Sequence, residues 1–373
     1  MNKADIIRYA KNIPGKKTRR KIVAIYADDF GSIRVKDQEA RQRMMLAGMP
    51  LDKDRYSRFD TLCSTEDLQR LFEVLCSVKD HNGHHACFTP FANIANPDFE
   101  KISESGFTKY YRESFVDTLN RYGQAYDGAF ELWQQGLVED IFHPEYHGTE
   151  HINVLRFMQA LQSGHASTRL AFNNESVALP PLPGEEDIAQ ATTVFYIEKA
   201  EENEALKHDI KVGMQLFEDL LGYRPKQFTP GAGIYSPALH ATLKEEGIEY
   251  INVLRYHAYP LGDGQYVKHF LYNGKRNAEG QKYVVRNCVF EPYLDDCSRN
   301  ANVVGNCLKN IEAAFRMHAP AIISTHRVNF SGGLEQVHRD DSLAQLKVLL
   351  DEILRRWPDV EFMNGSQLCN TIF

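Results

Sequence analysis

Short apolar runs alternate with longer segments of helical periodicity over most of this 373-residue chain. The run KIVAIYADD at 21–29 precedes the periodic segment EDLQRLFEVLCSVKD at 66–80, and AIISTHRVN at 321–329 precedes SLAQLKVLLDEILRRW at 342–357. In the last segment apolar side chains return every three or four residues, which is typical of a helix with one buried face. Strands that alternate with helices predict a parallel sheet, either a barrel or a doubly wound sheet.

The length fits one α/β barrel enlarged by insertions, because such barrels often reach roughly 200 to 250 residues or more as a single unit. The alternation is interrupted near 33–60, 98–135 and 173–190, where we expect loop insertions or small subdomains. No linker composition brackets these segments. We therefore expect an N-terminal arm over 1–20 and a single barrel domain over 21–373.

The composition argues against several classes of partner. Hydrophobic residues make up 43% of the chain and charged residues 25%, as in ordinary globular proteins. A net charge of -7 argues against nucleic acid or an anionic membrane as the main partner. We find neither a membrane-spanning run nor a signal-peptide core, so we expect a cytoplasmic protein. The seven cysteines form no Cys-x-x-Cys pair, which favours reduced thiols. No pattern in the sequence indicates an oligomeric state.

Polar side chains stand where the apolar runs end. Because the carboxyl ends of parallel strands share one face of a barrel, where such folds keep their chemistry, we expect these groups to meet. They are the pair Asp28 and Asp29, His143 with His147 and His151 behind it, Thr229 with Pro230 and Gly231, Arg255, and His326.

The two adjacent aspartates need something that offsets their repulsion. A turn explains one of them, since Asp bonds its own backbone and Gly31 supplies a positive φ, whereas a bound cation explains both. His147 and His151 are four residues apart, so on a helical turn their imidazoles share one face and can bind a cation together with a carboxylate. Without a cation each would be an ordinary surface or core histidine. His326 closes a strand, where a general acid or base could be held beside a metal-bound water.

The order of these pieces resembles the metal-dependent polysaccharide deacetylases, carbohydrate esterases that remove N- or O-acetyl groups from sugars. Their first motif, Thr-Phe-Asp-Asp-Gly, is similar to YADDFG, which implies Asp28 as catalytic base and Asp29 as metal ligand. The second, His-(Ser/Thr)-x-x-His, resembles HGTEH and implies His147 and His151 as the other ligands. The last, Leu-x-His, resembles STH and implies His326 as the catalytic acid.

The third motif, Arg-x-Pro-x-Gly after a phenylalanine, resembles FTPGAG and implies that Thr229, Pro230 and Gly231 line the substrate site. Thr229 stands where the family has the arginine that steers the base. The fourth motif, Asp-x-x-Asp-Trp, has no counterpart after GIEYINVLR, where Arg255 and His257 stand instead. Arg255 is therefore a candidate for substrate binding and for replacing the missing guanidinium.

The resemblance covers most of the chain from Lys21 onward and implies a distorted (β/α)7-type barrel, related to the TIM barrel, with loop insertions. It implies a divalent metal, zinc first, with cobalt, iron, manganese and nickel as alternatives for the same ligands. The metal would polarise an acetyl carbonyl and lower the pKa of a bound water. Asp28 would take the proton, and His326 would protonate the departing amine or alcohol. The implied substrate is an acetylated sugar or oligosaccharide, with N- and O-acetyl groups both open.

Two other interpretations stay open. A second deacetylase family, acting on chitooligosaccharides, also begins with Ala-Asp-Asp-Phe-Gly, although its later histidines are spaced differently from HGTEH. The two missing motif elements are also consistent with a carbohydrate-binding barrel that has lost turnover.

Overall fold

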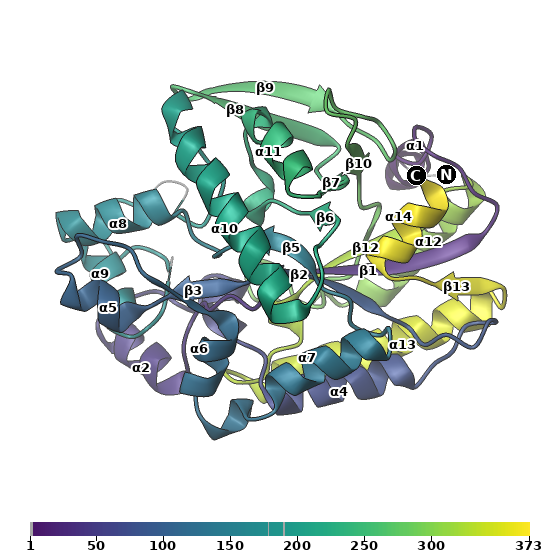
Figure 1. The fold of residues 1–373 in the computed structure, drawn as a ribbon. Helices are drawn as coiled ribbons and strands as arrows, with labels where there is room; N and C mark the ends of the chain where they lie inside the picture. Colours follow the sequence, from purple (N-terminus) through teal and green to yellow (C-terminus); the bar gives the residue numbers. More distant parts are fainter. Residues whose placement is uncertain (1–2, 178, 189–190) are drawn as a thin grey trace.

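The computed structural model describes residues 3–177, 179–188 and 191–373, and a parallel sheet forms the centre of this part of the chain. Its strands are β1 (Lys21–Phe30), β2 (Phe88–Asn93), β5 (Glu145–Gly148), β6 (Gln227–Phe228), β7 (Tyr250–Asn252), β10 (Lys282–Val284), β11 (Cys288–Val289), β12 (Ala321–His326) and β13 (Val360–Phe362). The order is β10-β7-β6-β5-β2-β1-β12-β11, with β13 beside β1 (Figure 1). The two end strands are not paired with each other within the described residues, so the barrel is open. The predicted distorted (β/α)7-type barrel is confirmed in this open form.

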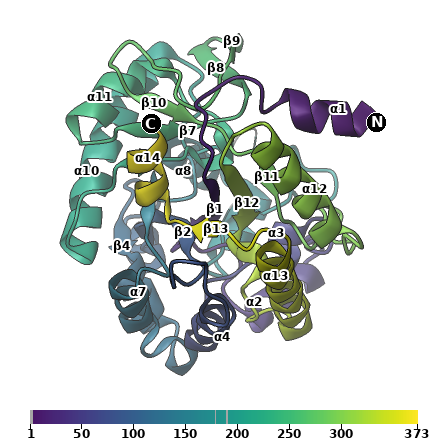
Figure 2. The ribbon, with the colours of Figure 1, turned by 90° about the vertical axis from the view of Figure 1, so that its right-hand side faces the viewer.

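The helices surround this sheet, as the view along the strands in Figure 2 shows. They are α1 (Lys3–Ala10), α2 (Gln38–Leu46), α3 (Arg55–Phe59), α4 (Thr65–Cys76), α5 (Phe99–Glu104), α6 (Phe115–Arg121), α7 (Ala129–Val138), α8 (Val154–Ser163), α9 (Ala166–Phe172), α10 (Asn203–Leu221), α11 (His240–Glu245), α12 (Val303–Arg316), α13 (Gln336–Arg356) and α14 (Gly365–Ile372). Short 3-10 turns lie at Gln124–Tyr126, Ala200–Glu202, Gly231–Gly233, Pro237–Leu239 and Arg327–Asn329. Within the described residues, every helix is too short or too polar to span a lipid bilayer.

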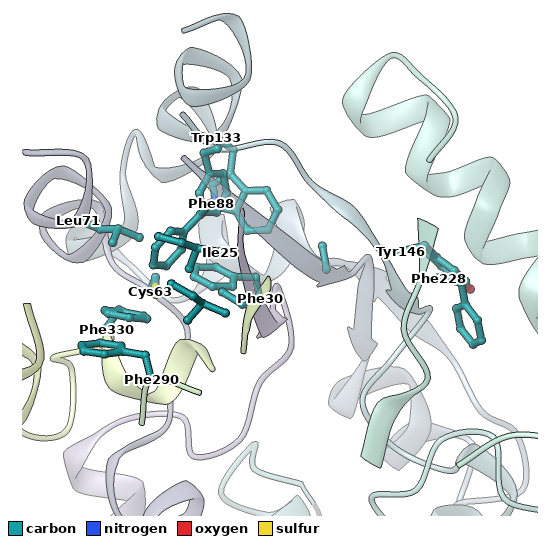
Figure 3. Close-up of a cluster of buried hydrophobic side chains, with 14 of the residues drawn as sticks. Ile25, Phe30, Cys63, Leu71, Phe88, Trp133, Tyr146, Phe228, Phe290 and Phe330 are labelled. Carbon is teal, nitrogen blue, oxygen red and sulfur yellow. The ribbon is translucent and has the colours of Figure 1, made fainter. Parts of the chain in front are cut away.

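The largest apolar core lies between the strands and the helices outside them, and Figure 3 shows part of it. Ile25 and Phe30 of β1 are fully buried there with Phe88 of β2 and Leu71 of α4. Burying a side chain of this size contributes about 1.5 to 3 kcal/mol. Because β1 is buried along nearly its whole length, its continuous apolar sequence fits a central parallel strand. This packing fixes where the carboxyl end of β1 lies.

Two antiparallel ribbons lie outside the parallel sheet. One pairs β3 (Ala95–Pro97) with β4 (Arg112–Ser114), and the other pairs β8 (Tyr256–Gly262) with β9 (Gln265–Phe270). The first ribbon overlaps the predicted insertion at 98–135, and α2 and α3 lie in the insertion at 33–60. Parts of two other predicted segments, residues 1–2 of the arm and residues 178, 189 and 190 of the third insertion, lie outside the described residues.

The structure corrects one predicted strand end. The run around His143 was expected to end a strand at that residue, but β5 begins only at Glu145 and ends at Gly148. His143 therefore lies toward the amino end of β5, where its ring packs against Tyr223 with centroids 5.3 Å apart. His147, four residues later, takes the position at the carboxyl end.

Candidate metal and catalytic site

A bulge at the end of β1 presents both aspartates at the carboxyl edge of the sheet. Successive residues of a strand normally point to opposite faces. The pairing of β1 with β2 shifts its register between Ala27 and Phe30, which re-aims the side chains between them. Asp29 adopts a left-handed φ of 75°, and Ser32 donates to its carbonyl oxygen from Oγ at 2.8 Å. Such a conformation costs a non-glycine residue about 1 to 3 kcal/mol, so surrounding contacts must hold it.

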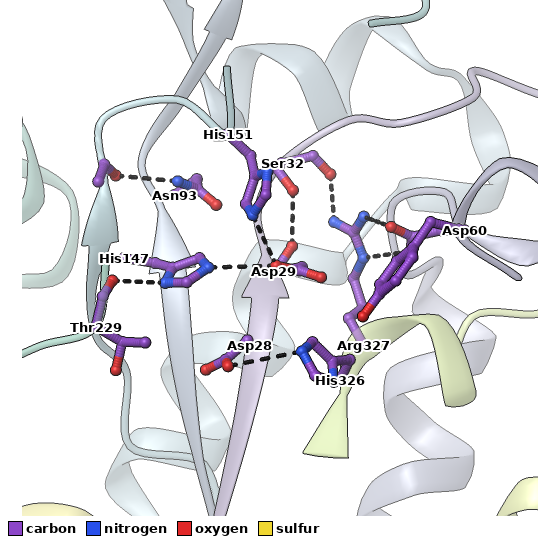
Figure 4. Close-up of polar contacts among 12 residues, drawn as sticks. Asp28, Asp29, Ser32, Asp60, Asn93, His147, His151, Thr229, His326 and Arg327 are labelled. Carbon is purple, nitrogen blue, oxygen red and sulfur yellow. Dashed lines mark hydrogen bonds and ion pairs between the residues drawn. The ribbon is translucent and has the colours of Figure 1, made fainter. Parts of the chain in front are cut away.

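Two contacts hold the loop that follows the bulge. Gly31 has φ 80°, and a Cβ at this position would lie 2.1 Å from the carbonyl oxygen of Asn93, so the backbones can approach only with glycine here. Arg327 is fully buried and donates to the carbonyl oxygen of Ser32 and, at 3.0 and 2.8 Å, to the two carboxylate oxygens of Asp60 (Figure 4).

His147, on β5, and His151, in the loop after β5, face the end of β1 (Figure 4). The expectation that a helical turn brings them together is wrong, because His147 lies on β5 and α8 begins only at Val154. Gly148, with φ 125°, instead lets the chain turn sharply after the strand. The two imidazole centroids are 5.2 Å apart as a result.

The donor atoms of Asp29, His147 and His151 fit a divalent cation. Nδ1 of His147 lies 2.8 Å from the carbonyl oxygen of Thr229, which can only accept, so Nδ1 donates there and Nε2 is the nitrogen left to face Asp29. That Nε2 lies 3.2 Å from Oδ1 of Asp29, and Nε2 of His151 lies 3.0 Å from the same oxygen. All three residues are buried, and their potential ligand atoms lie within 4.8 Å of one another. A cation or a shared proton between these two nitrogens and this oxygen would satisfy all three atoms.

The pKa shifts of Asp29 and His151 agree with this interpretation. Burial raises the pKa of the Asp29 carboxyl group, but the two histidines outweigh burial and hold that pKa well below its usual range. Burial lowers the pKa of His151. An ionised carboxylate and neutral imidazoles are the forms that bind metals.

Arg286 holds the second aspartate, Asp28. Its Nη1 and Nη2 donate to Oδ2 and Oδ1 of Asp28, each at 2.6 Å, in a bidentate ion pair. The same guanidinium donates to Oγ of Ser324 at 3.1 Å and to Oγ1 of Thr229 at 3.3 Å. Burial raises the pKa of Asp28, but Arg286 outweighs it, and the pKa lies below the usual value. The guanidinium beside Asp28 thus comes from Arg286, whereas Arg255 lines the adjoining cavity.

His326 stands beside Asp28 because β12 pairs in register with β1. Its Nε2 lies 3.8 Å from Oδ2 of Asp28, and its Nδ1 lies 2.6 Å from Oε1 of Glu291. Glu291 also pairs with Arg55 and accepts from Nδ2 of Asn329 at 2.8 Å. Burial lowers the pKa of His326, but Glu291 and the two aspartates reverse the shift and raise it to about 9. His326 therefore carries a proton at neutral pH.

Sequence reasoning missed Arg286 and Glu291. Both lie in the segment KYVVRNCVFEPY at 282–293, near β10 and β11, which are three and two residues long. Each follows a short apolar run, as the predicted site residues do. That signal could have found them, but runs this short are hard to recognise as strands.

The remaining predicted residues lie around the same centre. Thr229, Pro230 and Arg255 line a cavity of about 370 Å³ that reaches Asp28. Gly231 backs the site, since a Cβ there would lie 2.5 Å from Cγ2 of Val194. No larger residue fits at this position without displacing Val194.

A second cavity, of about 460 Å³, opens from the same centre. Asp29, Ala232 and His326 line both cavities. The candidate catalytic groups therefore lie between two spaces.

Comparisons with solved structures find matches to the fold at low sequence identity. A Parabacteroides distasonis protein described as a glycoside hydrolase/deacetylase matches with a TM-score of 0.51 and 7% identity, over 96% of this chain and 72% of that one. A Mycobacterium smegmatis protein described as a polysaccharide deacetylase matches with a TM-score of 0.43 and 13% identity, over 96% and 91% of the two chains. The alpha-amylase AmyC from Thermotoga maritima matches with a TM-score of 0.46 and 11% identity, over 95% and 75%.

Sequence comparison identifies a family. No curated protein sequence gives a significant match. The sequence model of glycosyl hydrolase family 57 matches residues 99–287, a segment that carries His147, His151, Thr229 and Arg286. Because this segment is more than half of the 373 residues, the chain belongs to glycosyl hydrolase family 57.

Proposed function

We propose that this protein is a metal-dependent hydrolase that removes acetyl groups, N- or O-linked, from a carbohydrate. The observation that carries the proposal is the buried group of Asp29, His147 and His151, in which Nε2 of the two histidines lies 3.2 and 3.0 Å from the same carboxylate oxygen. Family membership supports a carbohydrate-acting hydrolase, and the resemblance of the motifs to polysaccharide deacetylases supports the acetyl group as the target.

Asp29, His147 and His151 would hold the metal. A divalent cation bound there would supply Lewis-acid polarisation of the acetyl carbonyl and make water more acidic. Zinc suits one carboxylate and two imidazoles best, although cobalt, iron, manganese and nickel accept the same donors. With three protein ligands, coordination positions remain for water and substrate.

Asp28 acts as the general base in this proposal. Its two carboxylate oxygens are fixed by Arg286 at 2.6 Å each, so the group keeps one orientation and stays ionised. The arginine lowers the basicity of the carboxylate in exchange for this orientation. The loss of the third-motif arginine therefore does not leave the base unsupported.

His326 acts as the general acid. It is protonated at neutral pH because Glu291 binds its Nδ1, and its Nε2 side faces Asp28. A positively charged imidazole in this position can donate a proton to the departing amine or alcohol. Glu291 thus supplies a carboxylate that holds His326 in its charged form, which disfavours the interpretation of an inactive binding barrel.

Glycoside hydrolysis is the second candidate function, because the family match favours it. That reaction commonly uses two carboxyl groups, one of which must be protonated to act as the acid. Each carboxylate at this centre has a cationic or imidazole partner: Arg286 for Asp28, two histidines for Asp29, and Arg55 with His326 for Glu291. These partners favour the ionised carboxylates, so the centre suits metal-assisted deacetylation better.

An acetate-release assay over a panel of sugars tests the proposal. The panel contains N-acetylglucosamine, chitooligosaccharides of increasing length and O-acetylated oligosaccharides, and unacetylated α-glucans serve as the glycosidase substrates. We expect acetate from at least one acetylated sugar, loss of release on chelation, and recovery when a divalent metal is added back. Asp29→Asn should be inactive, whereas Asp351→Asn, a change on the exposed face of α13, should match the wild type.

The assay also separates the alternatives. New reducing ends from α-glucans, formed equally well with and without chelator, would contradict the proposal in favour of glycoside hydrolysis. Release that is confined to chitooligosaccharides would identify the substrate class of the second deacetylase family. Binding of sugars without any acetate release across the panel would instead favour a carbohydrate-binding barrel.

A further inference from the structure

Arg34 has a buried guanidinium group without a hydrogen-bond partner. The residue is 7% exposed, and Nε is buried without an acceptor. Within the described part of the chain, no acceptor lies within hydrogen-bond distance of this guanidinium, and the nearest carboxylate oxygen in an ion pair, Oδ2 of Asp60, is 4.0 Å from Nε. Burying a charged group without full pairing is unfavourable, so such a group points to a missing ligand.

Asp60 does not balance the charge of Arg34. Both of its carboxylate oxygens already accept from Arg327, at 3.0 and 2.8 Å, in a bidentate pair. One carboxylate therefore faces two guanidinium groups. Arg34, Arg327 and Asp60 together therefore carry a net positive charge.

Arg34 borders the larger of the two cavities at the site. Arg34 lines the space of about 460 Å³ together with Asp29 and His326, so a ligand that contacts the guanidinium is held in the same space as the reacting groups. Two other carboxylates line this cavity. Asp54 accepts from the backbone N–H of Ser57 at 2.9 Å as the N-cap of α3.

The other carboxylate, Asp187, is exposed. His165, which also lines the cavity, bonds the carbonyl oxygen of Glu186 through Nε2 at 2.8 Å. The acceptors of this cavity are thus engaged locally or face solvent, whereas Nε of Arg34 is buried without an acceptor, and the further partner of its guanidinium is the Tyr56 ring, with Cζ 5.7 Å from the centroid.

We propose that Arg34 binds an anionic group, a carboxylate or a phosphate, carried by the sugar that occupies this cavity. A guanidinium presents parallel N–H donors that match either oxyanion in a bidentate pair. The substrate class is then an acidic or phosphorylated acetylated sugar rather than a neutral one. This inference rests on the proposed function for the identity of the ligand as a sugar.

Equilibrium binding tests the inference without any hydrolysis. Glucuronic acid, glucose 6-phosphate and glucose are titrated by NMR at equal ionic strength into the purified wild type, Arg34→Gln and the charge-matched control Arg70→Gln. Arg70 lies on α4, is half exposed and pairs with Glu66. We expect the wild type and Arg70→Gln to bind one or both anionic sugars about tenfold to a hundredfold more tightly than glucose, the usual gain from hydrogen bonds to a charged group. In Arg34→Gln this preference should disappear.

The two anionic sugars show which anionic group the site prefers. Tighter binding of glucuronic acid would indicate a carboxylate, and tighter binding of glucose 6-phosphate would indicate a phosphate. If Arg34→Gln fails to fold, Arg34→Lys takes its place in the test. This variant keeps a positive charge but not the parallel N–H donors of a guanidinium, so it should retain a reduced preference for the anionic sugars. Equal binding of glucose and both anionic sugars by the wild type would overturn the inference, and so would an unchanged preference in folded Arg34→Gln. A failed acetate assay with an intact anion preference would reject the proposed reaction alone.

Discussion

Replacing Glu291 with glutamine should separate the role of His326 as an acid from a purely structural role. Glu291 accepts from Nδ1 of His326 at 2.6 Å and is the main reason that the pKa of this buried histidine is raised. A pKa of about 9 against an ordinary 6.5 corresponds to roughly 3 kcal/mol in favour of the protonated ring. Removing the nearest negative charge should lower the pKa of His326 by about one to three units.

The assay is the pH profile of kcat for acetate release. The wild-type rate should fall on the alkaline side as His326 loses its proton, and in Glu291→Gln this limb should move to lower pH by the same one to three units, about the effect of one close ion pair. Glu335→Gln is the control, because Glu335 pairs with Arg58 at 3.4 Å, away from His326. An alkaline limb that stays in place in Glu291→Gln would refute the assignment of His326 as the acid.

The free energy of unfolding should also depend on the titration of His326. Because the pKa of His326 is higher in the folded protein than in the unfolded chain, the ion pair with Glu291 stabilises fully below about pH 6.5 and is lost as the pH rises through about 9. The difference in unfolding free energy between the wild type and Glu291→Gln, measured by urea denaturation with chelator present, should therefore shrink between pH 6.5 and 9. A difference that is constant over this window would show that the pair does not titrate as described.

Three further predictions concern the metal ligands, the base and the turn after β1. Asp29→Asn should lose most of its bound metal, whereas Asp28→Asn should keep the metal and lose about a hundredfold to ten-thousandfold in turnover. Metal analysis together with the acetate-release assay distinguishes the two variants. Full metal content in Asp29→Asn would contradict the assignment of Asp29 as a ligand. Arg286→Lys keeps the positive charge but loses the bidentate ion pair with Asp28, so kcat should fall with little change in KM or metal content. A change in KM alone would indicate that Arg286 binds substrate instead. Gly31→Ala should lower the melting temperature by several degrees more than Gly106→Ala. Both positions have a positive φ, but of the two only Gly31 has a carbonyl oxygen 2.1 Å from where the new Cβ would lie. An equal drop in melting temperature in both variants would exclude this close contact as the cause.

The sequence predicts the barrel and the centre of the site because β1 and β12 are long and buried. Their continuous apolar runs identify them as central parallel strands, and their last residues must then meet at one edge. Asp28 and His326 are direct register partners in the sheet, as that logic requires. The bulge that turns Asp29 beside Asp28 depends on pairing with β2, which the sequence of β1 alone does not contain.

Local sequence does not determine how the remaining site residues come together. His147 and His151 have the spacing of a helical turn, yet a strand end and a sharp turn at Gly148 bring them together. Arg286 and Glu291 act across 258 and 35 residues of sequence, on Asp28 and His326 respectively. Their positions result from how short strands dock on β7 and β12, which is a tertiary property.

The position of a bound divalent cation tests the central claim most directly. Crystals grown with zinc and measured at the zinc absorption edge would locate the ion by anomalous scattering. We predict one strong peak at about 2.0 to 2.2 Å from a carboxylate oxygen of Asp29 and from Nε2 of His147 and of His151. A protein that releases acetate at full rate while this peak is absent, or while the ion is bound elsewhere, would contradict the account.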